Sequence, residues 1–307
     1  MRILHLDSGR EMRGGQWQVL RLMEGLAAVG VESTLLARPA APLALAAKER
    51  GWRVEPLGFG RTALLVRRHD LVHVHDAHAH TLAALALVAG GPPLVVARRV
   101  AFPIGSPWGR SPTCQLPSWK YARACHYLAV SEYVRRALIS GGVPEAKISV
   151  VYDGVPVMEP SAGTRVLALD NSADPQKGAA LAIEAARLAG IDLLLSGNLE
   201  RDLPQAATFV YLTRAEGLGS AALLAMSAAV CVIASRVGGL PEAVRDRETG
   251  LLVDNDAPAV AAAIAELARD PDLARRLGQA ARRAVIENFT VDRMVRCTME
   301  VYQKVLS

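Results

Sequence analysis

Residues 216–242 read EGLGSAALLAMSAAVCVIASRVGGLPE, and this stretch decides the fold. A glutamate and two glycines precede an apolar helical segment, a buried strand follows, and a second glycine pair precedes another helix. Glycine turns at helix starts present backbone N–H groups and the positive end of the helix dipole to an anion. The alternative to an anion-binding site is an ordinary αβα segment, in which the glycines only allow the chain to turn. The stretch therefore predicts a parallel α/β sheet.

The same stretch resembles the donor-site signature of the retaining, family-4-type glycosyltransferases of the GT-B fold. The matching residues are Glu216, Gly217, Leu218 and Gly219, and GGLPE at 238–242 matches the second glycine turn of the family. The family has a second glutamate where this chain has Leu224. The resemblance implies an α/β protein with two Rossmann-like, doubly wound domains that face a central cleft.

The length of 307 residues is about twice that of a typical domain, which also predicts two domains. The resemblance implies an N-terminal, acceptor-side domain over residues 1–157 and a shortened C-terminal donor domain over 158–287. A last helix, 288–307, is expected to cross back to the first domain. Strand and helix patterns alternate along the chain, as in parallel sheets. The predicted helices are residues 16–29, 79–89, 117–124, 131–140, 179–189, 257–269 and 272–287.

The composition narrows the partners and the compartment. The net charge of +5 favours anionic partners. Nucleic acid is not the expected partner, because the sequence has no basic run with interleaved aromatic residues. Cysteines stand far apart and without CxxC spacing, so neither a zinc cage nor a disulfide framework is expected. The N-terminal residues lack the pattern of a signal peptide, and a reducing cytoplasm is the expected compartment. These cysteines are Cys114, Cys125, Cys231 and Cys297.

The resemblance implies sugar transfer from a nucleoside-diphosphate sugar, with retention and without a metal ion or other cofactor. The leaving diphosphate gains negative charge, so fixed cations and N–H groups stabilise the transition state. We expect Lys177 to bind the donor phosphates and Glu216 to orient the donor sugar. A solvated lysine and a helix-capping glutamate are the alternatives. The backbone groups expected to help bind the phosphates belong to Gly217, Leu218, Gly219 and Ser220.

Three features of the donor side depart from the family pattern. Ser172 stands where the family has an arginine, and Leu224 replaces the glutamate that binds the ribose. Residues 198–207 are shorter than the strand and helix that the family has there. Together these changes suggest a weakened, altered or lost nucleotide site.

In the first domain, Gly14 and Gly15 resemble the Gly-Gly loop with which the family approaches the donor phosphate and the acceptor. Arg99 stands where many relatives have a histidine that faces the donor sugar. We therefore expect Arg99 to supply the cation missing at Ser172, and Arg98 to lie on the acceptor side. An arginine pair that binds an acceptor phosphate, or one that only lies on the surface, is the alternative.

Strand alternation in LVHVHDAHAH, residues 71–80, sends His73 and His75 to the same face of the sheet. A metal site is one interpretation of this spacing. Neutral histidines that are hydrogen-bonded at a strand end are favoured, so no metal ligands are predicted. We expect His75, Asp76 and His80 near the acceptor.

Two other segments have alternative interpretations. Asp254-Asn255-Asp256 imitates the metal-binding DxD motif of another glycosyltransferase fold, but its position predicts a turn. Trp17, with Arg13 and Arg21, is suited to lipid headgroups at the inner face of the membrane, unless Trp17 packs in the core.

The leading function is therefore glycosyl transfer to a cell-envelope glycan, such as a polysaccharide or lipopolysaccharide, or to a lipid-linked acceptor. The alternative is a catalytically silent GT-B protein that binds sugar or nucleotide weakly, or that supports an active transferase. A sugar-nucleotide epimerase is a third candidate, but its two-carboxylate arrangement is not visible in the sequence.

Overall fold

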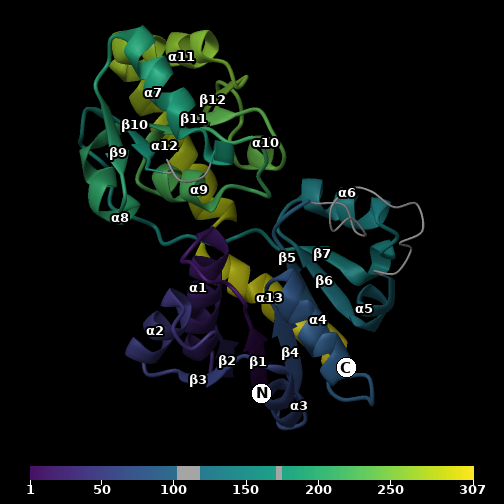
Figure 1. Ribbon diagram of the computed structural model, residues 1–307. Coiled ribbons are helices and arrows are strands. Elements are labelled where there is room, and N and C mark those ends of the chain that lie inside the picture. The colour runs from purple at the N-terminus through teal and green to yellow at the C-terminus, as the bar shows by residue number, and fades with distance from the viewer. Residues whose placement is uncertain (102–117, 171–174) are drawn as a thin grey trace. The chain divides into compact units, whose positions relative to one another are not determined.

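The computed structural model describes residues 1–101, 118–170 and 175–307, so Cys114 and Ser172 lie outside the described residues. The chain divides into two compact units (Figure 1). The first unit is Met1–Tyr152 with Val291–Ser307, and the second is Asp153–Thr290. Each unit contains one parallel sheet, which confirms the predicted class of two Rossmann-like α/β folds.

The first unit has a seven-stranded sheet in the order β3-β2-β1-β4-β5-β6-β7. All its strand pairs are parallel, and the order reverses direction at β1, as in doubly wound sheets. The strands are β1 (Arg2–Leu6), β2 (Glu32–Ala37), β3 (Arg53–Pro56), β4 (Leu71–Val74), β5 (Leu94–Arg98), β6 (His126–Ala129) and β7 (Ile148–Val150). The helices are α1 (Gly14–Ala28), α2 (Pro42–Glu49), α3 (Phe59–Val66), α4 (Ala77–Ala86), α5 (Ser118–Arg123), α6 (Glu132–Ser140), the 3₁₀ turn η1 (Glu145–Lys147) and α13 (Val291–Leu306).

Side chains alternate between the two faces of this sheet, and each face has its own cover. Ile3 and Leu71 pack with Leu22 of α1 and with Val295 and Tyr302 of α13. The opposite face is covered by α4, which contacts β1, β4 and β5. The last helix of the chain is therefore part of the core of the first unit.

The second unit has a five-stranded parallel sheet in the order β12-β11-β10-β8-β9. The strands are β8 (Arg165–Leu169), β9 (Leu193–Ser196), β10 (Ala206–Tyr211), β11 (Cys231–Ser235) and β12 (Gly250–Val253). The helices are α7 (Ala179–Ala189), α8 (Leu199–Asp202), α9 (Ser220–Ser227), α10 (Leu240–Ala243), α11 (Ala257–Arg269) and α12 (Pro271–Asn288), with 3₁₀ turns η2 (Pro175–Lys177) and η3 (Leu203–Gln205). Its core includes Val166, Val210, Ile233, Ile264 and Leu277.

Local sequence explains where several helices begin. Side chains of Asp76, Ser131, Asp256 and Asp270 accept backbone N–H groups at the starts of α4, α6, α11 and α12. Such caps satisfy N–H groups that have no partner inside the helix. The structure also contains α2 and α3, which are absent from the predicted helices. Both have only eight residues, so their periodic signal is short.

Between β9 and β10 the chain makes only the short helix α8 and the turn η3. This is the region that the sequence predicts to be shortened, and β9 is consequently an edge strand. None of the helices in the described parts of the chain is long and apolar enough to cross a membrane.

Candidate active site

The candidate donor site lies at the carboxyl ends of β8, β10 and β11 in the second unit. Loops at this edge of an open parallel sheet are the usual place for ligands. Three segments meet there: η2 with Lys177, the turn from Thr213 to Gly219, and the glycine pair Gly238-Gly239. The site therefore joins residues that the sequence analysis took from two separate motifs.

The two glycine turns of the opening stretch pack directly against each other. Gly238 has φ +58°, and a Cβ atom there would lie 2.1 Å from the carbonyl oxygen of Glu216. Gly239 donates its N–H to the same carbonyl at 3.1 Å. The Gly239 N–H is thus used to hold Glu216. The second glycine turn supports the backbone of the first one.

The Glu216 carboxylate is the centre of a polar cluster. Lys177 Nζ donates to Glu216 Oε2 at 3.0 Å, and the Tyr211 hydroxyl donates to the same oxygen at 2.5 Å. Glu216 Oε1 accepts the N–H of Gly217 at 3.1 Å. The side chains of Lys177 and Glu216 are 31% and 18% exposed, so the ion pair remains accessible to a ligand.

Burial raises the pKa of Tyr211 well above its usual value, and the negative Glu216 raises this pKa further. The phenol therefore stays protonated and remains a hydrogen-bond donor to Glu216. Sequence reasoning missed Tyr211. The only signal was a tyrosine at the carboxyl end of a predicted strand, five residues before Glu216.

Lys177 is held by its own loop. Gly178 has φ +64°, and a Cβ there would lie 2.7 Å from Leu212 Cβ. The Gln176 carbonyl accepts from Arg214 N at 3.0 Å and from Thr213 Oγ1 at 3.3 Å. The Lys-Gly segment is therefore fixed to the end of β10.

Gly217, Leu218 and Gly219 are buried, and Ser220 begins α9 after Gly219, whose φ is +98°. The first N–H groups of a helix have no acceptor inside it, which makes this start suitable for an anion. Leu224 is only 5% exposed and lies within α9. It presents no polar atom to this site.

Asp254-Asn255-Asp256 has a structural role. Asp256 caps α11 by accepting the N–H of Ala259. Asn255 donates to the Thr213 carbonyl at 2.8 Å and accepts from Ser235 Oγ at 2.6 Å. The segment is a turn, as the sequence predicts, and it holds the loop that leads to Glu216.

In the first unit, polar residues gather where β1, β4 and β5 end. Gly14 and Gly15 begin α1, and a Cβ at Gly15 would lie 3.7 Å from Arg99 Cδ. Arg98 is the last residue of β5. Asp7 follows β1 and accepts from Gly9 N and Gln16 Nε2. Burial, and then the charge of Asp76, raise the pKa of Asp7.

Asp76 and His80 have local partners. Asp76 accepts the N–H and hydroxyl of Ser8, at 2.5 and 2.7 Å, besides two N–H groups of α4. The buried His80 places its Nε2 2.9 Å from the Lys120 carbonyl, and burial lowers the pKa of His80 to about 4. A role of His75, Asp76, His80 and Arg98 near the acceptor stays a prediction.

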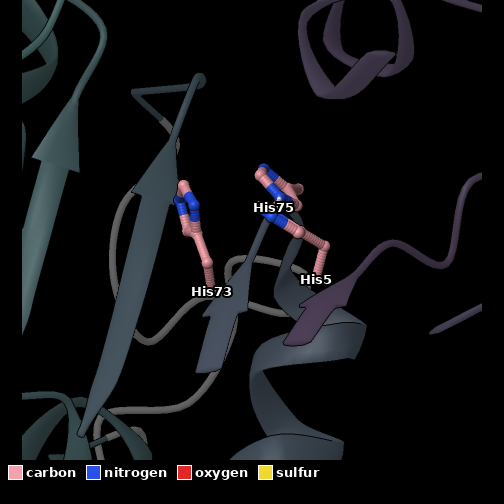
Figure 2. A group of neighbouring side chains, drawn as sticks. All are labelled: His5, His73 and His75. Carbon is pink, nitrogen blue, oxygen red and sulfur yellow. Dashed lines mark hydrogen bonds between the residues drawn. The ribbon is translucent and has the colours of Figure 1, made fainter. Parts of the chain in front are cut away.

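Three buried histidines lie together in the first unit (Figure 2), and His73 Nδ1 lies 2.6 Å from the hydroxyl of Tyr302 of α13. Figure 2 shows His5 of β1 with His73 of β4 and with His75, which directly follows β4. The two strands are paired in parallel register. Their ligand nitrogens lie within 4.8 Å of one another. Burial lowers the pKa of His5 to about 3 and the pKa values of His73 and His75 well below their usual value. Sequence reasoning missed His5, which only the pairing of β1 with β4 brings to the other two.

The three nitrogens match in kind the imidazole ligands that zinc prefers. Two contacts oppose this use. His5 and His75 are hydrogen-bonded to each other at 3.1 Å, and Arg99 Nη1 lies 3.4 Å from His75 Nδ1. A guanidinium at this distance repels a divalent cation. Neutral, hydrogen-bonded histidines therefore fit the geometry better than metal ligands do.

Two family models match the chain. The model described as Glycosyltransferase Family 4 matches residues 12–159, and the model described as Glycosyl transferases group 1 matches residues 183–284. The first match includes Gly14, Gly15 and the residues at the ends of β4 and β5, and the second includes Glu216 and both glycine turns of residues 216–242.

Individual relatives match shorter parts. Alpha-maltose-1-phosphate synthase of Mycolicibacterium smegmatis is 41% identical over 121 residues, which is 37% of this chain and 31% of that protein. D-inositol 3-phosphate glycosyltransferase of Streptomyces scabiei is 42% identical over 98 residues, which is 32% of this chain and 22% of that protein. The match thus covers less than a third of either relative.

Solved structures match nearly the whole chain. Anabaena Alr3699/HepE, solved with UDP and glucose, has a TM-score of 0.83 at 17% identity over 98% of this chain and 99% of that one. Sucrose-phosphate synthase of Thermosynechococcus elongatus has a TM-score of 0.79 at 19% identity over 99% and 98%. At this identity the likeness establishes the fold. The two family matches, over residues 12–159 and 183–284, show that the chain belongs to the group 1 glycosyltransferases, and its fold is GT-B.

Proposed function

We propose that this protein transfers a sugar from a nucleoside-diphosphate sugar to a cell-envelope glycan or lipid-linked acceptor, with retention and without a metal ion. The observation that carries the proposal is the accessible Lys177–Glu216 pair beside the start of α9. The solved Anabaena Alr3699/HepE was also studied with UDP-glucose, which supports a donor of this class. One relative is named a glycosyltransferase.

The ion pair suggests how a donor is received. An incoming diphosphate competes with Glu216 for the Lys177 ammonium, and the start of α9 offers N–H groups to the same phosphates. Glu216, still held by Tyr211 and by its backbone, then has an oxygen to accept sugar hydroxyls. Binding of the donor would thus convert a resting ion pair into two separate ligand contacts.

The same cation then favours bond cleavage. Negative charge on the leaving diphosphate grows as the bond to the anomeric carbon breaks, so Lys177 interacts more strongly in the transition state than in the ground state. In our proposal Arg99, which lies beside Gly15 at the start of α1, contributes a second cation. Arg98, His75, Asp76 and His80 would then define the acceptor side.

A contact with the membrane surface is part of the same proposal. Trp17 is 39% exposed on α1, so it is not fully buried in the core. Its neighbours along the helix include Arg13 and Arg21, which suits an interface with anionic lipid. Flotation with anionic vesicles tests it, and Trp17→Ala should reduce the bound fraction.

A catalytically silent protein is the second candidate. The observation that favours it is the buried Leu224, which cannot replace the ribose-binding glutamate expected from the family resemblance. Such a protein would keep the ion pair and bind sugar nucleotides weakly, but it would not release nucleotide. Binding and turnover must therefore be measured separately.

The experiment compares Lys177→Ala with the wild type. Thermal shifts are measured with UDP, GDP, ADP and CMP sugars at up to about 1 mM, the upper range of common KM values. Release of the free nucleotide is then followed with the donor that binds. We expect one base to stabilise the wild type. Lys177→Ala should lower turnover by about 100- to 1000-fold, as for other groups that stabilise transition-state charge.

Arg187→Ala is the matched control, because Arg187 forms an exposed ion pair with Glu184 on α7 at 2.8 Å. Exposed pairs contribute little to stability, so this variant should behave like the wild type. No shift with any donor would refute the proposed function. A shift without nucleotide release would favour the silent protein.

A further inference from the structure

A line of hydrogen-bonded side chains connects β2 to the end of β5. Ser33 Oγ lies 3.3 Å from His5 Nε2, and His5 Nδ1 lies 3.1 Å from His75 Nε2. His75 Nδ1 lies 3.4 Å from Arg99 Nη1. His5 and His75 are 0% and 6% exposed, so solvent does not compete for the contact between the two rings. We call Ser33, His5, His75 and Arg99 the histidine line.

The guanidinium fixes the direction of every hydrogen bond in the histidine line. Arginine carries only donors, so the His75 nitrogen that faces it, Nδ1, must accept. His75 then carries its proton on Nε2 and donates to His5 Nδ1. His5 in turn carries its proton on Nε2 and donates to Ser33 Oγ. The opposite order would direct a His75 N–H against an N–H of Arg99.

The electrostatics of the site agree with two neutral rings. Burial lowers the pKa of His5 to about 3 and lowers the pKa of His75 well below its usual value. The charge of Arg99 lowers the pKa of His75 further. Neutral imidazole offers one donor and one acceptor, which is what each position in the line requires.

Arg99 lies beside the start of α1 as well as beside His75. Its Cδ lies 3.7 Å from the place of a Cβ at Gly15, so any larger residue there would meet the arginine stem. We propose that His75, supported by His5 and Ser33, is a positioning residue that orients the Arg99 guanidinium beside Gly14 and Gly15, at the start of α1, for the donor diphosphate. This inference rests on the proposed function, in which Arg99 is a donor-side cation.

The conservative variant separates orientation from packing. In His75→Asn, Oδ1 stands near the place of Nδ1 and still accepts from Arg99. In His75→Leu, no acceptor remains. We expect His75→Asn to keep kcat within about threefold of the wild type, and His75→Leu to lose about 10- to 100-fold in kcat, because small misplacements of a catalytic group have effects of this size. The donor KM should change less than kcat.

His126→Leu is the matched control. His126 is also a buried histidine with a serine partner, Ser149. It is the first residue of β6, so it lies at the amino ends of the strands, whereas His75 and Arg99 lie at the carboxyl ends. It should keep the wild-type kcat. Thermal unfolding of each variant verifies that it is folded at the assay temperature. Equal kcat losses in His75→Asn and His75→Leu would overturn the inference.

A second measurement does not depend on turnover. Nitrogen-15 NMR of the imidazole rings should show His5 and His75 neutral at pH 7, both protonated on Nε2. An Nδ1-protonated ring, or a charged ring, would overturn the histidine line. So would tight binding of Zn²⁺ to the wild type that is lost in His73→Ala. If no sugar nucleotide binds to the wild type, the proposed function fails, while the NMR result still decides the tautomers.

Discussion

At the scale of single residues, the donor-side loop depends on glycines whose roles differ. Gly238 and Gly190 both have positive φ, +58° and +68°. A Cβ at Gly238 would overlap the Glu216 carbonyl, whereas a Cβ at Gly190 would have nothing within 4 Å. An alanine at Gly190 therefore introduces only backbone strain, whereas an alanine at Gly238 introduces backbone strain and also displaces Glu216.

We expect Gly190→Ala to lower the free energy of unfolding by about 1–2 kcal/mol, the usual cost of a left-handed conformation. Gly238→Ala should cost about 1–3 kcal/mol more, because the overlap is with backbone. It should also weaken donor binding, since Glu216 must move. Urea unfolding followed by circular dichroism, with thermal shifts by the donor, measures both effects. Equal losses in the two variants would show that the contact with Glu216 carries no energy.

Single residues also show what the sequence can reveal about the site. Lys177 and Glu216 were identifiable because each stands in a short pattern beside glycines, and the structure brings them to 3.0 Å. His5 was not identifiable, because its partner His75 is distant in the sequence and is reached only through the pairing of β1 with β4. Tyr211 was missed although Glu216 is only five residues away, because a strand pattern does not show that the following turn brings the carboxylate back to the phenol. Local motifs predict residues within one loop, but contacts across strands need the register of the sheet.

At the scale of elements, periodicity predicted the longer helices and most strands. It did not reveal how closely two helices approach. Gly25 of α1 lies against α13: a Cβ at Gly25 would be 2.4 Å from Val295 Cγ2. Nothing in the α1 sequence indicates this, because a glycine within a helix usually only weakens it.

Gly25→Ala should therefore destabilise the protein by about 1–3 kcal/mol, although alanine has the higher helix propensity. Val295→Ala makes room for the new methyl group. In a double-mutant cycle, the two changes together should cost less than the sum of the single changes. Gly278→Ala in α12 serves as the comparison, because the Cβ there would lie 2.0 Å from the backbone carbonyl oxygen of Ala229. No side-chain truncation can make room for that methyl group. Additive costs at Gly25 and Val295 would refute the close approach of the helices.

At the scale of the whole molecule, histidines and tryptophans are distributed unevenly. All seven histidines and all four tryptophans lie in the sequence of the first unit, and the second unit has neither. Burial lowers the pKa of His5 to about 3 and of His80 and His126 to about 4, and those of His73 and His75 are also lowered. Acid should therefore affect the two units differently.

A histidine whose pKa is lowered by folding binds fewer protons in the native state than in the unfolded state. Its stabilising contribution is complete above pH 6.5 and is lost as the pH falls toward the folded pKa. Each such group can remove up to about 1.4 kcal/mol per pH unit. The raised pKa of Asp7 has the opposite effect, because protonation of this carboxylate at low pH stabilises the folded state. This is one group, whereas five histidines of the first unit lose their stabilising contribution.

We therefore predict that the first unit unfolds before the second one between pH 6.5 and about 4. Tryptophan fluorescence reports only the first unit, whereas far-UV circular dichroism reports both. At pH 7.5 the two signals should change closely together during urea unfolding. At pH 5 the fluorescence midpoint should move to lower urea, and the ellipticity should show a second transition. His5→Asn should reduce the shift, because asparagine does not titrate. Coincident transitions at pH 5 would mean that the two units unfold as one cooperative structure.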